Sequence, residues 1–372
     1  MSTNGAASDP TNGPSSDTAQ SADRPNRPSA RATSATDPDP FTLPRHGGAL
    51  AHAEKEFGIP YEGWLDLSTG INPNAYPIPE IPEVLWQNLP DQDLEHACIE
   101  AAQQYFECSE IEAVIPAPGT QSLIQWLPWL REPGTVGIVG PTYAEHATAW
   151  QAAGHEVTEI SELPEWGDFT VVVVTNPNNP DGRRRPRDGL LTLAEGQTHA
   201  GGLLVVDEAF ADVAPEISVA ADAGVEGLCV LRSFGKFFGL AGLRLGFALA
   251  HKELVSELRT ALGPWPVSGP ALEIGRTAMA DRDWQQLARE TLDRRAKAMN
   301  ALLVRNGIES KGGTNLFRLG QHDNAHDLYR HLAINGILTR AFENQPKFLR
   351  FGLPEEEDQM TRLDAALGQF GG

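Results

Sequence analysis

One lysine stands in an apolar, glycine-rich stretch that is suited to carbonyl chemistry. Lys236 lies within residues 232–247, Arg-Ser-Phe-Gly-Lys-Phe-Phe-Gly-Leu-Ala-Gly-Leu-Arg-Leu-Gly-Phe. An ammonium group in such surroundings is costly to keep charged, so its pKa should fall and leave an amine that can form a Schiff base. Ser233 and Arg244 offer a hydroxyl donor and a guanidinium fork for a phosphate. Aldehyde and phosphate chemistry together predict pyridoxal phosphate as the ligand, whereas the simpler alternative is an exposed lysine at a helix start.

Three further polar groups follow predicted strands, where ligands gather in open parallel sheets. Residues 118–121, Pro-Gly-Thr-Gln, join a strand to a helix, and their backbone amides form a cradle suited to phosphate. The turn-rich segment 176–182, Asn-Pro-Asn-Asn-Pro-Asp-Gly, could hold a ring substituent. Asp207 ends a buried strand and needs a partner there. A pyridinium N–H is one candidate partner, and an arginine salt bridge is the other.

The elements that must position these residues alternate as in a three-layer α/β domain. Apolar runs predict strands at 114–115, 136–139, 157–160, 171–175, 203–206 and 229–232. Helical patterns lie at 92–106, 143–153 and 188–199. A further helix follows the loop at 118–121 and continues through residue 130. The runs at 171–175, 203–206 and 229–232 are continuous, as expected for strands that are buried on both faces.

Beyond Pro264-Trp265-Pro266 the pattern changes to that of an α+β domain. We predict a helix over 268–306 with a break near 280, strands at 315–319, 336–339 and 348–352, and helices at 325–335 and at the C-terminus. The predicted domains are therefore a large α/β domain at 81–266 and a small C-terminal α+β domain at 267–372. Residues 41–80 are predicted to form an N-terminal arm that contributes to the active site, with Gly70 allowing close backbone approach to a ligand.

The composition argues against several classes of protein. The chain has 372 residues and a net charge of −21, which argues against nonspecific binding to nucleic acid or to an anionic membrane. No apolar run approaches the roughly 20 residues of a membrane span, and the sequence shows no secretory leader. The three cysteines have no metal-type spacing, which indicates a reducing compartment. We expect a cytoplasmic protein without a metal site.

Residues 1–40 differ in composition from the rest of the chain. They contain no Leu, Ile, Val or aromatic residue, so they cannot bury enough apolar surface to offset their ordering entropy. The alternative is a targeting peptide, but the aspartates among these residues depart from the acid-poor pattern of transit peptides. We predict a disordered tail.

In combination, these motifs resemble the fold-type I pyridoxal-phosphate enzymes of the class I/II aminotransferase group. The resemblance covers residues 41–372 and implies an α/β fold with a mainly parallel sheet in the large domain. It also implies a homodimer, because sites of this fold generally form at a dimer interface. By this resemblance Lys236 forms the Schiff base with the cofactor. Asp207 pairs with the pyridine nitrogen and keeps it protonated, so that the ring remains an electron sink.

The resemblance further implies which residues hold the cofactor and the substrate. Asn179 would donate to the ring 3-oxygen, and Tyr143 would stack on the ring. The cofactor's phosphate would be held by Gly119, Thr120, Gln121, Ser233 and Arg244. The substrate would contact His46, Gly70, Asn179, Arg340 and Arg350. Arg350 is assigned to a carboxylate and Arg340 with His46 to a phosphate, although the reverse assignment stays open.

Within the group, the chain is most similar to the threonine-phosphate decarboxylases of cobalamin biosynthesis. The stretches that carry this similarity are His46-Gly47-Gly48, residues 66–73, residues 207–210, residues 336–340 and residues 349–354. The implied reaction is decarboxylation of O-phospho-L-threonine to (R)-1-aminopropan-2-ol O-phosphate. The sequence does not fix which bond of the substrate's Cα is held perpendicular to the ring, so decarboxylation and transamination are separated by the resemblance alone.

Two other functions remain as alternatives. Aminotransferases for histidinol phosphate or an aromatic amino acid share the scaffold, but they usually have tyrosine where Phe210 stands. Related aminotransferases also often place a tyrosine at Leu89 that reaches the neighbouring subunit's cofactor phosphate, so that contact is open here. A catalytically silent binding protein is the third alternative, and the intact Lys236, Asp207 and Asn179 argue against it. His322 and His326 have helical spacing, but without an acidic or cysteine partner set they indicate a solvated helix face.

Overall fold

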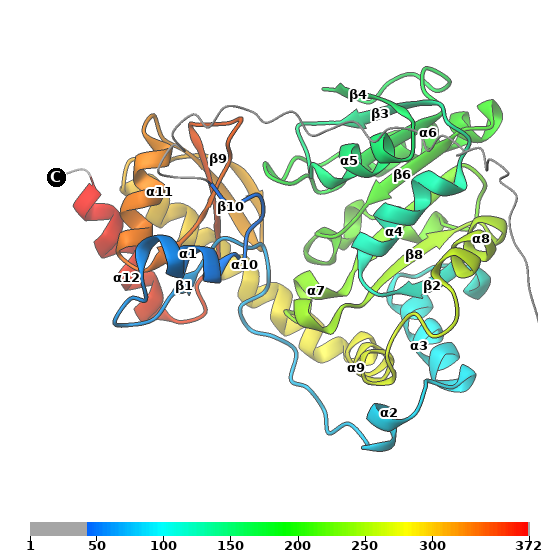
Figure 1. Ribbon diagram of the computed structural model, residues 1–372, viewed down its shortest axis with the longest axis horizontal. Coiled ribbons are helices and arrows are strands. Elements are labelled where there is room, and N and C mark those ends of the chain that lie inside the picture. Colours follow the sequence, from blue (N-terminus) through cyan, green and yellow to red (C-terminus); the bar gives the residue numbers. More distant parts are fainter. Residues whose placement is uncertain (1–42, 371–372) are drawn as a thin grey trace, which may run out of the picture. The chain divides into compact units, whose positions relative to one another are not determined.

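The computed structural model describes residues 43–370 of the chain. The predicted disordered tail at 1–40 lies outside the described residues. Within residues 43–370, no helix is long and apolar enough to cross a membrane. Two main sheets and the helices that pack on them make up this part of the chain (Figure 1).

The larger sheet has seven strands in the order β2-β8-β7-β6-β5-β3-β4. Their bounds are Val114–Ala117 (β2), Thr135–Val139 (β3), Glu156–Ile160 (β4), Val171–Thr175 (β5), Leu203–Asp207 (β6), Leu228–Ser233 (β7) and Gly246–Ala250 (β8). β8 runs antiparallel to β2 and β7, and the pairs from β7 through β4 are parallel. β5 and β6 are buried at every position, as expected for strands with both faces covered.

Helices surround this sheet and complete its core. They are α2 (Val84–Gln87), α3 (Gln92–Tyr105), α4 (Thr120–Trp126), α5 (Glu145–Ala152), α6 (Arg187–Ala200), α7 (Phe234–Phe237), α8 (Lys252–Leu262) and α9 (Gly269–Ala280). Apolar side chains of α4, α5 and α8, including Leu123, Trp150 and Leu258, join those of the strands in one buried cluster. This packing holds the carboxyl ends of β5, β6 and β7 in fixed positions.

The smaller sheet is antiparallel, with the order β12-β13-β10-β9. Its strands are Glu309–Thr314 (β9), Phe317–Gln321 (β10), Arg340–Ala341 (β12) and Phe348–Gly352 (β13). The helices here are α10 (Arg282–Arg305), α11 (Ala325–Ile334) and α12 (Glu357–Phe370). The N-terminal segment also belongs here: α1 (Leu50–Phe57) contacts α11, and β1 (Leu65–Asp66) pairs in parallel with β11 (Ile337–Leu338).

The predicted α/β fold class, with a large mainly parallel sheet and a smaller C-terminal sheet domain, is confirmed. The structure corrects three details of the elements. β8 and β9 are absent from the sequence prediction. The strand predicted at 336–339 is present as the shorter β11, which pairs with β1, and β12 follows it in a different sheet. The predicted helix break near residue 280 is present, because Asp281 ends α9 and its side chain accepts a hydrogen bond from the backbone N–H of Trp284 at the start of α10.

The domain boundaries remain proposals. α9 packs against α2 and α3, and α10 contacts β9 and β10. These contacts place α9 with the larger sheet, although the sequence assigns residues from 267 onward to the small domain. We therefore propose that the change between domains lies near Asp281, between α9 and α10.

Candidate active site

Residues from several elements line one pocket at the carboxyl ends of the parallel strands. Asp207 ends β6, Lys236 lies in α7, and Thr120 begins α4. All the predicted catalytic, cofactor-binding and substrate-binding residues lie on the pocket wall except Gly119, where an added Cβ would lie 2.7 Å from Nη2 of the pocket residue Arg244. Those on the wall are His46, Gly70, Thr120, Gln121, Tyr143, Asn179, Asp207, Ser233, Lys236, Arg244, Arg340 and Arg350.

The Lys236 side chain is partly buried and lines this pocket. Burial, and then the positive charge of Arg350, lower its pKa to about 8, while Asp207 opposes the shift. Its Nζ lies 5.7 Å from the centre of the Phe210 ring. A lysine that loses its proton near neutral pH can attack a carbonyl carbon.

The partner of Asp207 is a histidine. His146 Nε2 lies 2.9 Å from Asp207 Oδ2, and both side chains are buried. The other carboxylate oxygen accepts a hydrogen bond of 3.0 Å from the backbone N–H of Ala209. The arginine salt bridge considered for Asp207 is therefore not formed among the described residues, where Asp207 has His146 as its ion-pair partner.

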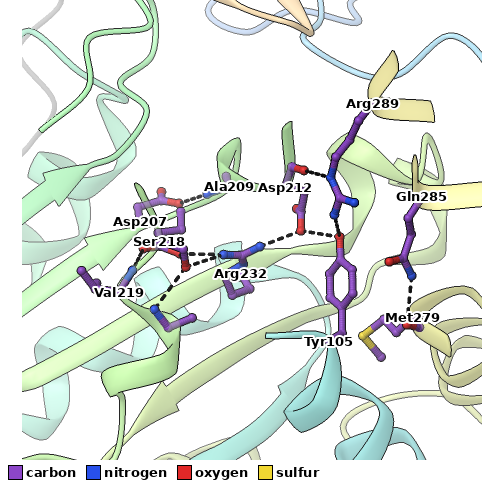
Figure 2. Close-up of polar contacts among 12 residues, drawn as sticks. Tyr105, Asp207, Ala209, Asp212, Ser218, Val219, Arg232, Met279, Gln285 and Arg289 are labelled. Atoms are coloured by element: carbon purple, nitrogen blue, oxygen red, sulfur yellow. Dashed lines mark hydrogen bonds and ion pairs between the residues drawn. The ribbon is translucent and has the colours of Figure 1, made fainter. Parts of the chain in front are cut away.

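A buried arginine of the neighbouring strand β7, Arg232, instead joins a network of polar contacts (Figure 2). Arg232 contacts Glu208 and Asp212, both at 2.6 Å. The Tyr105 hydroxyl donates to Asp212 Oδ1 at 2.8 Å, and Arg289 Nε donates to the Asp212 carbonyl at 2.7 Å. Since Glu208 and Asp212 flank the segment that carries Phe210, these contacts fix the loop that follows Asp207.

A backbone cradle lies at the start of α4. Gly119 has φ of +80°, and a Cβ at this position would lie 2.7 Å from Arg244 Nη2. Glycine therefore lets the guanidinium approach the free amides at the helix start, where a phosphate is favoured. Ser233 and Gln121 line the same side of the pocket, and the Tyr143 hydroxyl donates to Gln121 Oε1 at 3.1 Å. Burial, and then the charge of Glu145, raise the pKa of Tyr143 to about 12, so its hydroxyl stays protonated.

Arg350 connects the smaller sheet to the loop after β5. Its Nη1 donates to Asn179 Oδ1 at 2.6 Å and its Nη2 donates to the Ser68 carbonyl at 2.8 Å. Because the amide oxygen of Asn179 faces Arg350, its NH₂ group remains available as a donor. Burial, and then the charge of Arg340, lower the pKa of Arg350 to about 10, so it is still charged at neutral pH.

Comparison with known proteins establishes the family. The family model described as aminotransferase class I and II matches residues 83–367. The chain belongs to this family. The predicted membership of the class I/II aminotransferase group is thus confirmed.

Two curated relatives and one solved structure illustrate the similarity. Threonine-phosphate decarboxylase from Pseudomonas aeruginosa is 46% identical over 328 residues, which are 87% of this chain and 97% of the relative. Threonine-phosphate decarboxylase from Sinorhizobium sp. is 43% identical over 328 residues, 87% of this chain and 98% of the relative. The structure of histidinol-phosphate aminotransferase from Sinorhizobium meliloti in complex with pyridoxal-5'-phosphate has a TM-score of 0.71 at 18% identity, and it covers 91% of this chain and 98% of that chain. That last likeness shows the fold alone.

The residues of this class I and II aminotransferase site fit pyridoxal phosphate. A partly buried lysine of lowered pKa suits its aldehyde, and the Gly119–Arg244 cradle suits its phosphate. Asp207, held by His146, offers a carboxylate for a protonated ring nitrogen. An added Cβ at Gly119 would occupy the space of the Arg244 guanidinium, so the cradle depends on this glycine.

Two apolar rings pack against each other beside Gly70, and one of them, Phe210, lines the pocket. Phe210 and Phe317 meet edge to face with centroids 5.0 Å apart. A Cβ on Gly70 would lie 3.0 Å from the Phe210 ring and 2.9 Å from the Phe317 ring. A residue with a side chain would therefore clash with the two rings at position 70. The close approach of Gly70 to a ligand remains a prediction.

Four contributors to the site were missed by sequence reasoning: Arg45, Ser68, Glu145 and His146. His146 follows Tyr143 by three residues, and the two rings meet edge to face with centroids 6.2 Å apart. This spacing could have placed His146 beside Tyr143, but it does not indicate Asp207 as the partner of His146. Ser68 acts through its backbone carbonyl, which side-chain patterns do not report.

The two histidines with helical spacing each have a backbone partner. His326 Nε2 lies 3.1 Å from the Phe342 carbonyl. His322 Nδ1 accepts from the backbone N–H of Asn324 at 3.1 Å. Over residues 43–370, no group of three or more His, Cys, Asp or Glu could hold a metal ion.

Proposed function

We propose that the protein is a pyridoxal-phosphate-dependent decarboxylase that converts O-phospho-L-threonine to (R)-1-aminopropan-2-ol O-phosphate. The names of the two curated relatives support this reaction, because each relative is matched over nearly its whole length. The product is the amino-alcohol component of cobalamin biosynthesis that the resemblance implies, so we place the enzyme in that pathway.

The observation that carries the proposal is a pair of arginines on adjacent strands. Arg340 and Arg350 are direct cross-strand partners in β12 and β13, and both line the pocket. Like charges placed opposite one another destabilise a sheet, and Arg340 lowers the pKa of Arg350 through its charge. A substrate with both a phosphate and a carboxylate would neutralise the pair. Phosphothreonine has both groups, whereas histidinol phosphate has no carboxylate.

We assign roles to the site residues on this basis. Arg350 would hold the substrate carboxylate, and Arg340 with His46 would hold its phosphate. Asn179 would donate to the ring 3-oxygen through its NH₂ group, and Tyr143 would stack on the ring. Ser233, Arg244 and the 119–121 loop would hold the cofactor's phosphate.

When bound, pyridoxal phosphate supplies an aldehyde that captures the substrate amine and a protonated ring that accepts electrons from Cα. Asp207, supported by His146, would keep a proton on the pyridine nitrogen. Once the bond from Cα to the carboxylate has broken and carbon dioxide has left, Lys236 Nζ or water would return a proton to Cα, so that hydrogen replaces the carboxylate. Phe210, which lines the pocket with its ring centre 5.7 Å from Lys236 Nζ, would exclude water from this side of the pocket.

The test is product analysis with purified full-length protein, pyridoxal phosphate and O-phospho-L-threonine, without a keto acid. Release of carbon dioxide and aminopropanol phosphate over many turnovers is expected. No turnover, together with activity on histidinol phosphate plus 2-oxoglutarate, would assign the chain to the aminotransferases. In that case Phe210 would not discriminate between the two reactions.

We further propose that the enzyme is a cytoplasmic homodimer. Three apolar side chains in the segment around α2 support the dimer, since Val84, Trp86 and Leu89 are each at least half exposed. Contiguous exposed apolar residues often mark an interface between proteins. Light scattering should give twice the mass of one chain, and the mass of a single chain would refute the dimer.

A further inference from the structure

Residues 43–48, which we call the strap, lie along the pocket and are held from the side of the smaller sheet. Arg340 donates both of its terminal nitrogens to the strap, one to the Pro44 carbonyl and one to the Arg45 carbonyl. The backbone N–H of Gly48 donates to Ser68 Oγ at 2.6 Å. A Cβ on Gly47 would lie 2.3 Å from the Ser68 carbonyl oxygen, so the strap sits tightly on Ser68. The strap is thus fixed to Arg340 and to Ser68, whose carbonyl also accepts a hydrogen bond from Arg350.

On the other side, one carboxylate oxygen of α5 holds two strap side chains. Glu145 Oε1 lies 3.0 Å from Arg45 Nη2 and 3.4 Å from His46 Nε2. Glu145 is mostly buried, with 14% of its side chain exposed, whereas Arg45 is 66% exposed and His46 is 51% exposed. Arg45 and His46 both line the pocket, in which Arg340 and Arg350 are also present.

The contact between the strap and Glu145 is weak for a charged pair. Glu145 Oε1 is shielded from solvent, yet it accepts no hydrogen bond of good geometry. An ion pair with one exposed partner and no aligned hydrogen bond contributes little. A phosphate monoester carries up to two charges and three acceptor oxygens, so it can form charge-assisted hydrogen bonds that Glu145 does not form here.

We propose that Glu145 and the substrate's phosphate compete for Arg45 and His46. Arg45 is then a further phosphate-binding residue. Glu145 is a latch that holds the strap in the absence of substrate, and the substrate's phosphate displaces its carboxylate when the strap closes over the substrate. This inference rests on the proposed function only in requiring that the substrate is a phosphate monoester. The latch would favour phosphorylated substrates over similar amino acids, because only a strong anion can replace the carboxylate.

The first test measures binding of inorganic phosphate by calorimetry. The full-length protein is loaded with pyridoxal phosphate, which blocks the cofactor's own phosphate cradle. Glu145→Gln removes the competitor and should tighten phosphate binding about two- to fivefold. Arg45→Ala should weaken it about tenfold. Glu162→Gln is the matched control, because Glu162 pairs with Arg185, is 72% exposed and does not line the pocket. Weaker binding in Glu145→Gln, or unchanged binding in Arg45→Ala, would overturn the proposal.

The second test follows the strap itself by trypsin cleavage of the bond between Arg45 and His46. Glu145→Gln should be cut several times faster than the unaltered protein and than Glu162→Gln. Saturating inorganic phosphate should slow the cut in both the unaltered protein and Glu145→Gln. Equal cleavage of Glu145→Gln and the unaltered protein would show that Glu145 does not hold the strap. Neither readout depends on the reaction catalysed, so a failed decarboxylase assay and a failed latch are distinguishable.

Discussion

At the scale of single residues, burial sets the protonation of the group that must react. Lys236 has a pKa lowered to about 8, mainly by burial. A depressed lysine pKa means that the neutral amine is present at lower pH than for an exposed lysine. As the pH is raised toward 8, the rate of pyridoxal phosphate incorporation into the cofactor-free protein should therefore increase about tenfold per pH unit. Above pH 8 the rate should level off. Stopped-flow absorbance would follow this rate, and a rate that keeps rising beyond pH 10 would mean that Lys236 has an ordinary pKa.

The partner of Asp207 makes the second prediction at this scale. His146→Ala leaves one buried oxygen of Asp207 without its contact, so its carboxylate is less stable and its hold on the ring proton is weaker. We expect kcat to fall about tenfold to a hundredfold, from a cost of about 1–3 kcal/mol. His155→Ala is the control, because His155 is buried and contacts the Pro128 carbonyl outside the pocket. Equal losses of kcat per folded molecule in both variants would contradict the role of His146.

The sequence predicts a site residue when the residues next to it in the chain already indicate its chemical role. Lys236 lies between glycines and apolar rings, and Asp207 ends a β-branched run, so both were predictable. His146 is 61 residues from Asp207 in the chain, and its local sequence carries no mark of that contact. Glu145 and Arg45 likewise become neighbours only when the strap reaches α5.

At the scale of elements, the turn into α4 depends on a glycine for two separate reasons. Gly119→Ala would place a side chain at φ of +80° and also put its Cβ 2.7 Å from the Arg244 guanidinium. Gly58→Ala is a matched control, because Gly58 has φ of +82° but nothing lies within 4 Å of the added Cβ. Both variants should lose about 1 kcal/mol of stability from the left-handed backbone.

Only Gly119→Ala should weaken pyridoxal phosphate binding, by at least about tenfold, because Arg244 must move away from the cradle. Equilibrium dialysis of the cofactor against both variants measures this. Equal cofactor affinity in the two variants would show that the Gly119–Arg244 approach does not shape the phosphate site.

The strands differ in how clearly their own amino-acid sequences predict a β-strand. Val171–Thr175 and Leu203–Asp207 are continuous β-branched or leucine runs, and the prediction for each was confirmed. Gly246–Ala250 contains no β-branched residue, and Glu309–Thr314 is polar with two glycines, so neither has a local strand signal. Both form strands because a neighbouring strand supplies the hydrogen-bond partners, which is information from the tertiary structure.

At the scale of the whole described chain, one buried network joins elements of the large sheet to the helix that leads into the small one. Arg232 of β7 contacts Glu208 and Asp212, and Asp212 is contacted in turn by Tyr105 of α3 and Arg289 of α10 (Figure 2). Breaking a buried ion pair from one side leaves an uncompensated charge, which costs about 3–5 kcal/mol. Arg232→Leu should therefore lower the free energy of unfolding by about that amount.

The loss in Arg232→Leu should depend on pH in a definite direction. Burial already raises the pKa of Glu208, and Arg232 is the main group that opposes this rise. Without Arg232 the folded state holds a proton on Glu208 more tightly than the unfolded state does, so stability is retained at low pH and lost as pH rises. Urea unfolding at acidic and neutral pH should show a deficit that grows with pH. Arg259→Leu is the control, because Arg259 is half exposed and forms a surface pair with Glu95, so it should change stability little at either pH. A stability deficit that shrinks as pH rises would mean that the buried carboxylates are not the source of the instability. Arg232 would then act mainly by packing against Phe106, because its guanidinium carbon lies 4.5 Å from the centre of the Phe106 ring.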